Sequence, residues 1–451
     1  MTSKATQYLI YTLFFLLPWQ TVYLLREVFV GGEKWHYGTI SIYATQVIAL
    51  LIICCSGWMH HTQVCKWLKV RAWMQPSLFL SCVAICLYII MSALWSADPL
   101  LTLLYGVKIA VGFLLVLAIT SARYDTRYVL GTLVGGFTLS ALLAIGQFAL
   151  QGDFSSTLLG LSKHEAFQGG VSVIEADGGR WLRAYGSFPH PNMLGAVMAT
   201  ATILSIGGLM SYGKQRCWRR FFLITMTVCF TALLMSFSRS GLIALIVGAI
   251  AMGILLAQQR NELQINMAVL KKISIGLAGT CAMMVAVLWI TYSDLYTTRA
   301  QADARLERLS INERTSQVGE ALEVIKSNPI LGTGAGTYTK YLAEIDQNAE
   351  PIWKYQPVHN TPLLIIAELG VIGVALVILI GVQAVVKIRK NIARAVEKGH
   401  IIKVAMVGVL ITYLTAAMFD HWQWDHHMGT LLLAILIAYA CGMHDKTERS
   451  L

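Results

Sequence analysis

Residues 240–257 read Ser-Gly-Leu-Ile-Ala-Leu-Ile-Val-Gly-Ala-Ile-Ala-Met-Gly-Ile-Leu-Leu-Ala, a run of apolar and small residues without a charged side chain. At a rise of about 1.5 Å per residue, a helix of this length crosses most of the hydrocarbon core of a bilayer, which is about 30 Å thick. A single isolated run satisfies its own backbone hydrogen bonds in lipid only as a helix. The stretch therefore predicts a transmembrane helix.

Comparable apolar runs recur along the whole chain. Only 13% of the 451 residues are charged, 56% are hydrophobic and the mean hydropathy is +0.61, whereas soluble proteins carry about a quarter charged residues. We therefore predict an all-α integral membrane protein with about twelve transmembrane helices, which form a single polytopic domain over residues 1–451. The predicted spans are 8–25, 40–58, 77–96, 100–120, 128–150, 190–211, 221–237, 240–258, 273–292, 362–386, 404–419 and 429–443.

The distribution of positive charge predicts the orientation. Lys and Arg concentrate in loops that stay in the cytoplasm. Every even-numbered connection between the spans is basic, which places the N-terminus inside, and the first span lacks a signal-peptide cleavage site. The net charge of +11 thus reports topology and gives no evidence for nucleic-acid binding. The basic residues of these connections include Lys66, Lys69, Arg71, Arg127, Lys214, Arg216, Arg219, Arg220, Arg260, Lys271, Lys272, Lys387, Arg389 and Lys390.

Two predicted outward segments, 151–189 and 293–361, are too long for simple turns. The second contains apolar positions at helical spacing and is ended locally by Asn328-Pro329. We predict two short amphipathic helices on the outer face, because loops of this length are usually functional or disordered and the patterning argues against disorder. The two predicted helical faces are Arg314-Val318-Leu322-Ile325 and Tyr338-Tyr341-Leu342-Ile345.

Several basic residues lie where charge is costly in a membrane. Arg239 separates two apolar runs with almost no loop, and an unpaired arginine there costs about 2–3 kcal/mol. It should face an anion or a polar cavity, although snorkelling to the interface is an alternative. Arg180 and Arg183 precede the sixth span, where an interfacial Arg–Trp–Tyr belt is the alternative. Three converging arginines would suit a diphosphate, because guanidinium groups bind phosphate oxygens bidentately. Lys108, inside the fourth span, is a less specific candidate.

His359 lies directly before the tenth span, in Gln-Pro-Val-His-Asn-Thr-Pro. A histidine at the mouth of a span can accept a proton near neutral pH, although a lone histidine is more often structural. Asn360 follows it, and Glu368, two turns deeper, is a carboxylate that requires a partner.

Two further motifs resemble a phosphate-binding loop and a metal site, and we favour neither interpretation. The glycines of residues 332–336 lack the Lys-Ser/Thr of a phosphate-binding loop and follow no strand, so they predict a tight backbone turn. The segment Asp420–His427 has residue types found in metal sites, but its position between two spans equally fits an interfacial belt, which we favour. We predict no metal and no cofactor.

In their order and spacing, several segments resemble the O-antigen ligase and O-antigen polymerase superfamily of membrane glycosyltransferases. The resemblance extends from about Leu94 to Gly373. The segments that carry it are Ala93–Pro99, Arg183–Gly195, Ser236–Gly241, Arg314–Gly336 and His359–Gly370.

This resemblance implies a multi-pass protein of the bacterial inner membrane that transfers a glycan from undecaprenyl diphosphate to an acceptor hydroxyl at the periplasmic face. Transfer would invert the anomeric centre and need no nucleotide sugar or metal. His359 would be the base, Arg183 and Arg239 would bind the donor diphosphate, and Arg314 is a further candidate for that role. The partners would be the lipid-linked donor, a lipid A-core or other glycan acceptor, and membrane lipids. Candidate supporting residues are Asn360, Glu368, Arg180 and Lys108.

Within the superfamily, a ligase is favoured because a single large loop precedes His359, and a polymerase is the alternative. A third branch that glycosylates proteins generally carries a longer C-terminal domain. A transporter or lipid-linked sugar flippase is disfavoured, because the sequence shows no internal repeat and the 293–361 loop has no counterpart in the first half.

Overall fold

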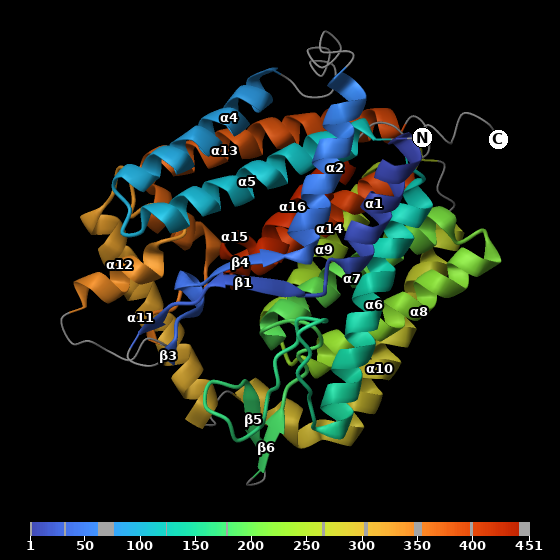
Figure 1. Cartoon of the computed structure of the whole chain (residues 1–451). Coiled ribbons are helices and arrows are strands. Elements are labelled where there is room, and N and C mark those ends of the chain that lie inside the picture. The colour runs from blue at the N-terminus through green and yellow to red at the C-terminus, as the bar shows by residue number, and fades with distance from the viewer. Residues whose placement is uncertain are drawn as a thin grey trace.

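Helices form nearly all of the regular structure (Figure 1). The computed structural model describes residues 2–30, 33–61, 76–122, 124–176, 179–263, 267–301, 305–346, 354–396 and 400–441. Its α-helices are α1 (Thr2–Leu16), α2 (Ala44–His61), α4 (Pro76–Met91), α5 (Pro99–Ser121), α6 (Thr126–Leu150), α7 (Pro191–Tyr212), α8 (Arg216–Met235), α9 (Arg239–Gln258), α10 (Met267–Gln301), α11 (Arg305–Ser327), α12 (Tyr338–Ile345), α13 (Thr361–Val396), α14 (Ile401–Ala417), α15 (Trp422–Asp425) and α16 (His427–Cys441).

Each of the twelve predicted spans falls on one helix: α1, α2, α4 to α10, α13, α14 and α16. Eight helical segments of the described chain are long and apolar enough to cross a membrane, and α2, α14 and α16 are shorter apolar helices. The prediction of an all-α membrane protein is confirmed.

The first predicted span was too long. Helix α1 ends at Leu16, because the ring of Pro18 disfavours helical geometry at the residue before it. The chain continues into strand β1 (Val22–Arg26), which pairs antiparallel with β4 (Ile40–Tyr43). The remaining strands are β2 (Phe29–Val30), β3 (Glu33–Lys34), β5 (Val173–Ala176) and β6 (Gly179–Leu182), and the 3-10 helices are η1 (His36–Gly38) and η3 (Ser92–Leu94). None of these two-stranded ribbons was predicted.

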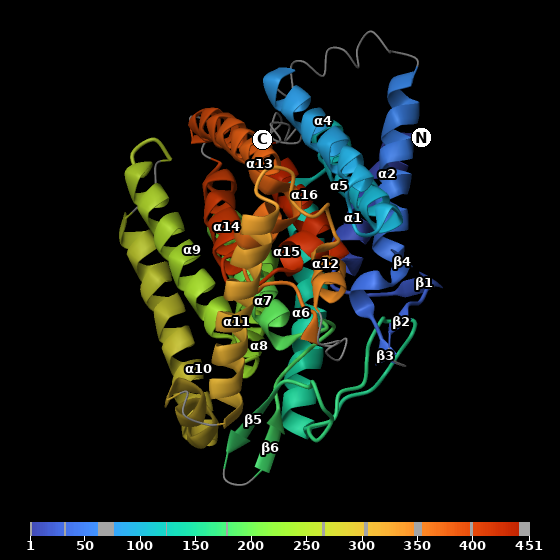
Figure 2. The ribbon, with the colours of Figure 1, turned by 90° about the vertical axis from the view of Figure 1, so that its left-hand side faces the viewer.

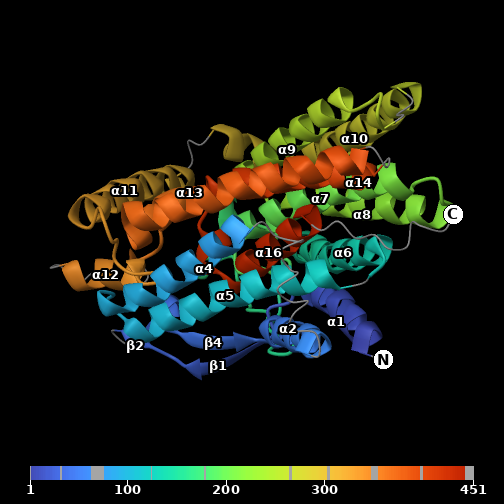
Figure 3. The same ribbon diagram turned by 90° about the horizontal axis from the view of Figure 1, so that it is seen from above.

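Helix α7 lies at the centre of the bundle and contacts α8, α9 and α14 (Figures 2 and 3). Small residues allow the close approach, since a Cβ atom at Gly208 would lie 2.4 Å from the Phe222 ring. By contrast, α9 exposes Ile246 and Ile250 on its outer side, as expected for a face in contact with lipid.

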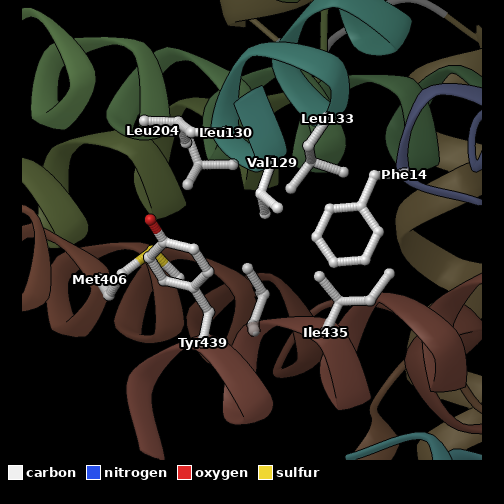
Figure 4. Close-up of a pocket in the computed structure, with 9 residues that line it drawn as sticks. Phe14, Val129, Leu130, Leu133, Leu204, Met406, Ile435 and Tyr439 are labelled. Carbon is white, nitrogen blue, oxygen red and sulfur yellow. The ribbon is translucent and has the colours of Figure 1, made fainter. Parts of the chain in front are cut away.

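A small apolar pocket lies between α1, α6, α7, α14 and α16 (Figure 4). Phe14, Leu133 and Ile435 are among its lining residues. Its volume of about 10 Å³ leaves room for no more than about one water molecule, so the pocket is a packing defect and too small for a substrate.

Helix α13 is interrupted at Gly370, where the loop before α12 packs against it. Gly370 has φ 59° and ψ −169°, a conformation that is essentially restricted to glycine. The loop replaces the hydrogen bonds that the break removes: the N–H of Val371 donates to Pro329 O at 2.9 Å, and the N–H of Gly334 donates to Glu368 O at 2.9 Å. The tight turn predicted for residues 332–336 is thus present, and it inserts into a broken helix.

The two long segments gather with the strands at the lower and left side of Figure 1, away from the start of the chain. Segment 151–189 contains the β5–β6 hairpin, and segment 293–361 contains α11 and α12. Helix α10 has a kink at Tyr292, the last residue of the predicted ninth span, and continues to Gln301.

The predicted apolar face of α11 is only partly buried, and its Ile325 is half-buried. Val318 and Leu322 are exposed, and α11 is 23 residues long instead of short. The buried face lies next to the predicted one and contains Gln317, Ala321 and Val324. The small Ala321 side chain suits the close approach of α11 to α13.

Candidate active site

Helix α11 provides the framework of the site. Glu307, Arg314 and Gln317 follow one another at spacings of seven and three, which places them on one side of a helix. Glu307 and Gln317 are buried, and Arg314 is half-buried. Two groups of residues converge on this side: a histidine group near Gln317 and an arginine group near Glu307.

His359 is held in a defined orientation at the start of α13. Its Nδ1 lies 2.7 Å from Gln317 Oε1, which can only accept a hydrogen bond, so Nδ1 carries the proton and Nε2 keeps a free lone pair. The next residue, Asn360, caps α13 by accepting from the N–H of Leu363 at 2.9 Å, and its Nδ2 donates to Met418 O at 2.9 Å. The backbone around His359 is therefore fixed on both sides.

A second histidine, His421, lies beside His359, with a ring-centroid distance of 5.1 Å. His421 Nδ1 lies 2.7 Å from Asp425 Oδ2, and His421 Nε2 lies 3.9 Å from Asp420 Oδ1. One ligand-type atom each from His359, His421 and Asp420 lies within 4.8 Å of the others. The end of α14 and the short helix α15 thus contribute to the same site as α13.

The two histidines differ in charge. Burial, together with the charge of His421, lowers the pKa of His359 to about 4. Burial also acts to lower the pKa of His421, but the charge and hydrogen bond of Asp425 and the charge of Asp420 outweigh it and raise that pKa to about 9. At neutral pH His359 is a neutral imidazole that can accept a proton, and His421 is an imidazolium.

The interpretation of Asp420–His427 as an interfacial belt is wrong, since Asp420, Trp422, Gln423 and His427 are buried inside the protein. His359, His421 and Asp420 have the chemistry of a two-histidine, one-carboxylate metal site, and both histidines have a hydrogen-bond partner at Nδ1. These three residues could hold a divalent cation. The same geometry fits a proton-accepting histidine with a charged neighbour, and metal independence stays a prediction.

Lys108 and Glu368 hold α15 in place. Lys108 Nζ donates to Trp424 O at 3.0 Å and to Asp425 O at 2.9 Å. The carboxylate of Glu368 accepts from Trp424 Nε1 at 2.8 Å and from the N–H of Gly336 at 2.9 Å. Neither side chain bonds to His359. Both instead fix the turn that carries Asp425, the partner of His421.

The arginine group lies at the turn between α8 and α9. Arg183 is buried, its Nε donates to Ser236 O at 2.8 Å, and its Nη2 donates to Asn192 Oδ1 at 2.9 Å. Arg239, the first residue of α9, donates to Glu307 Oε2 at 3.0 Å. Both predicted diphosphate-binding arginines therefore meet at one turn.

Arg314 lies between the two groups. Its positive charge is among the causes that lower the pKa of Arg183, of His190 and of His359, after the larger effect of burial in each case. Arg180 does not join the cluster: it lies on β6, 3.9 Å from Glu175 Oε1.

Several residues of the site were missed by sequence reasoning. Gln317 carried no signal, because an isolated glutamine in a helix is ordinary. Arg299 follows the polar residues Ser293 and Asp294 after the predicted ninth span, so it was counted as part of the loop. His190 was within a quoted motif; its Nδ1 accepts from the N–H of Asn192 at 3.1 Å, and its Nε2 lies 2.9 Å from Ser172 Oγ. Asp420 and His421 lay in a segment that was assigned to the interface.

The comparison with known families agrees with this arrangement. Residues 221–378 match the family model described as O-Antigen ligase, and no curated protein matches the chain. The matched region runs from α8 into α13, so it includes Arg239, Glu307, Arg314, Gln317 and His359. Over residues 221–378 the chain is therefore similar to the O-antigen ligase family, which agrees with the resemblance of its sequence motifs.

Proposed function

We propose that this multi-pass membrane protein is an O-antigen ligase, which transfers a glycan from undecaprenyl diphosphate to a sugar hydroxyl of the lipid A core. The observation that carries the proposal is the placement of a proton acceptor and an anion-binding group along one helix. Glu307 and Gln317 are ten residues apart on α11, a distance of about 15 Å along its axis, and Arg314 lies between them. A sugar diphosphate could bind by its anionic end while its anomeric carbon approaches His359.

His359 would act as the general base. Its Nε2 accepts the proton of the acceptor hydroxyl while the hydroxyl oxygen forms a bond to the anomeric carbon of the donor. The bond between that carbon and the diphosphate oxygen breaks on the opposite face, so the configuration inverts. Asp420 would offset the positive charge that develops on His359. Its carboxylate also offsets the positive charge of His421.

The arginine group would stabilise the leaving diphosphate. Negative charge grows on the phosphate oxygens as the glycosidic bond breaks, and fixed guanidinium groups lower the free energy of that transition state. Arg183 and Arg239 are both anchored before a ligand binds, Arg183 by Ser236 and Asn192 and Arg239 by Glu307. No step requires a metal ion.

The basic even-numbered connections support a periplasmic position for this site in the inner membrane. With the N-terminus inside, the segments that contain α11 and the β5–β6 hairpin lie on the periplasmic side. The lipid-linked donor and the core acceptor would both be accessible there, and membrane lipids would surround the outer helices.

Deletion of the gene, followed by gel analysis of cell-surface polysaccharide, tests the proposal. A ligase predicts that all core-attached O-antigen disappears while full-length polymer remains on the lipid carrier. A core that carries one repeat unit would instead identify a polymerase. Loss of polymer from the outer face, with lipid-linked repeats retained inside, would identify a flippase and reject a transferase.

A further inference from the structure

One carboxylate bridges two arginines at the end of α11. Glu307 Oε2 accepts from Arg239, and Glu307 Oε1 accepts from Arg299 at the end of α10. The side chain of Glu307 is 5% exposed and that of Arg299 is 14% exposed, whereas that of Arg239 is 44% exposed. Two oxygens of one anion between two guanidinium groups is also the arrangement by which arginines hold a phosphate.

Arg299 is anchored to the same turn as Arg183. Arg299 Nε donates to Phe237 O at 3.2 Å, and Arg183 Nε donates to the preceding carbonyl, Ser236 O, at 2.8 Å. Phe237 has a positive φ of 50°, which is uncommon for a residue with a side chain and is typical of functional turns. Both arginines thus use Nε to hold the turn before α9, and their terminal nitrogens bind other partners, Asn192 for Arg183 and Glu307 for Arg299. The start of α9 follows this turn, and the dipole of a helix favours an anion at its N-terminus.

The local charge is unbalanced. Arg183, Arg239, Arg299 and Arg314 contribute four positive charges, and Glu307 contributes one negative charge. Burial and the charge of Arg299 hold the pKa of Arg183 well below its usual range, although a guanidinium stays protonated near neutral pH. The two oxygens to which Arg183 donates, Ser236 O and Asn192 Oδ1, are neutral. A ligand with more than one negative charge would therefore bind here more favourably than a single carboxylate does.

We propose that Arg299 is a further residue of the donor site, and that the carboxylate of Glu307 occupies the place of diphosphate oxygens until the donor replaces it. The inference rests on the proposed function, because it assigns the diphosphate of the lipid-linked glycan as the ligand. Glu307 keeps two converging arginines in position in the free protein, and Arg239 and Arg299 exchange this carboxylate for phosphate oxygens when the donor binds. The exchange moves no covalent bond and needs no co-reactant.

Binding of undecaprenyl diphosphate to the full-length protein in detergent tests the inference, with undecaprenyl phosphate as the comparison ligand. We expect Arg299→Gln to weaken diphosphate binding by about 10- to 100-fold, and Arg299→Lys also to weaken it, because an ammonium group cannot reproduce the bidentate contact. Glu307→Gln should bind diphosphate more tightly than the wild type, although its ligand-free form should unfold at a lower temperature. Arg305→Gln is the matched control on α11, because Arg305 pairs with Glu175 away from the cluster, and it should bind as the wild type does.

Wild-type affinity of Arg299→Gln would overturn the role of Arg299. Weakened binding by a folded Glu307→Gln protein would overturn the exchange, because Glu307 would then support the ligand instead of occupying its place. If Glu307→Gln does not fold, Glu307→Asp replaces it. The shorter side chain loses contact with one arginine, so this variant should also bind diphosphate more tightly, and unchanged or weaker binding rejects the exchange.

Arg183→Gln and Arg239→Gln separate this inference from the proposed function. If both lose binding while Arg299→Gln does not, only this inference fails; if both also bind normally, the proposed donor site itself is wrong.

Discussion

Replacement of His359 by alanine is the most direct test of the proposed chemistry. Removal of a general base typically lowers a rate by about 10²–10⁴. Because burial and the neighbouring His421 lower the pKa of His359 to about 4, this imidazole is a weaker base than a free one, and we expect a loss in the lower part of that range, about 10²–10³. The protein should still fold, since His359 lies at the junction of a loop and a helix.

The pH dependence gives an independent measure of the same residue. A lowered pKa means that His359 stays neutral, and able to accept a proton, at every pH above about 4. The wild-type rate should therefore persist from pH 7 to about 5 and fall only as the pH approaches 4, whereas an ordinary histidine with a pKa of about 6.5 would lose activity near that value.

The assay uses purified protein with lipid-linked donor and core acceptor, at matched protein concentration, with initial rates read from gels. His36→Ala is the control, because His36 is exposed and bonds to none of the site residues in the described part of the chain. Near-normal transfer by His359→Ala would refute the assignment of the base. The wild-type rate could instead fall near pH 6.5 on acidification (the acid limb of the pH profile), and His359→Ala could abolish this fall. That result would support His359 as the base and refute its lowered pKa.

Four other predictions follow from the same geometry. Arg183→Lys and Arg239→Lys should each reduce transfer at least about tenfold, because a point charge cannot replace a bidentate guanidinium; full activity in both would make them interfacial anchors. Transfer should continue in excess EDTA, and inhibition that Mg²⁺ or Mn²⁺ reverses would identify the histidine cluster as a metal site. His421→Gln removes a positive charge next to His359, so the pKa of His359 should rise and the acid limb should move to higher pH; an unchanged limb would contradict this coupling. Glu368→Leu leaves the N–H groups of Gly336 and Trp424 without an acceptor, at about 1–3 kcal/mol for each, and should lower the melting temperature; an unchanged melting temperature would remove its structural role.

The transmembrane helices were predictable from the sequence because each span carries its own signal, an apolar run as long as the membrane is thick. His359 and Arg239 were predictable for a related reason, since a titratable or charged group at the end of such a run is costly. The ribbon β1–β4 was not found, although Pro18 marked the end of α1, because residues 19–25 are uncharged and were assigned to the first span.

The pairings inside the site could not be predicted, because they depend on how distant helices pack. Arg239 and Glu307 are 68 positions apart, and Gln317 and His359 are 42 apart. The periodicity of α11 predicted a helix but did not find its buried residues Glu307 and Gln317, because polar residues do not count toward an apolar stripe. The polar segment after Asp420 looked like a membrane interface until the fold placed it beside α13.

The break in α13 has a consequence for the biogenesis of the protein. Hydrophobicity alone is sufficient for the tenth span to enter the bilayer, but its backbone is complete only when residues 329–334 bond to it on both sides of Gly370. Insertion and completion of this helix are therefore separate events. Because the loop precedes α13 in the chain, the partner segment is already synthesised when the broken helix enters the membrane. The backbone groups next to Gly370 therefore have no hydrogen-bond partner until the loop docks. Docking of the loop completes α13 and assembles the active site in the same step.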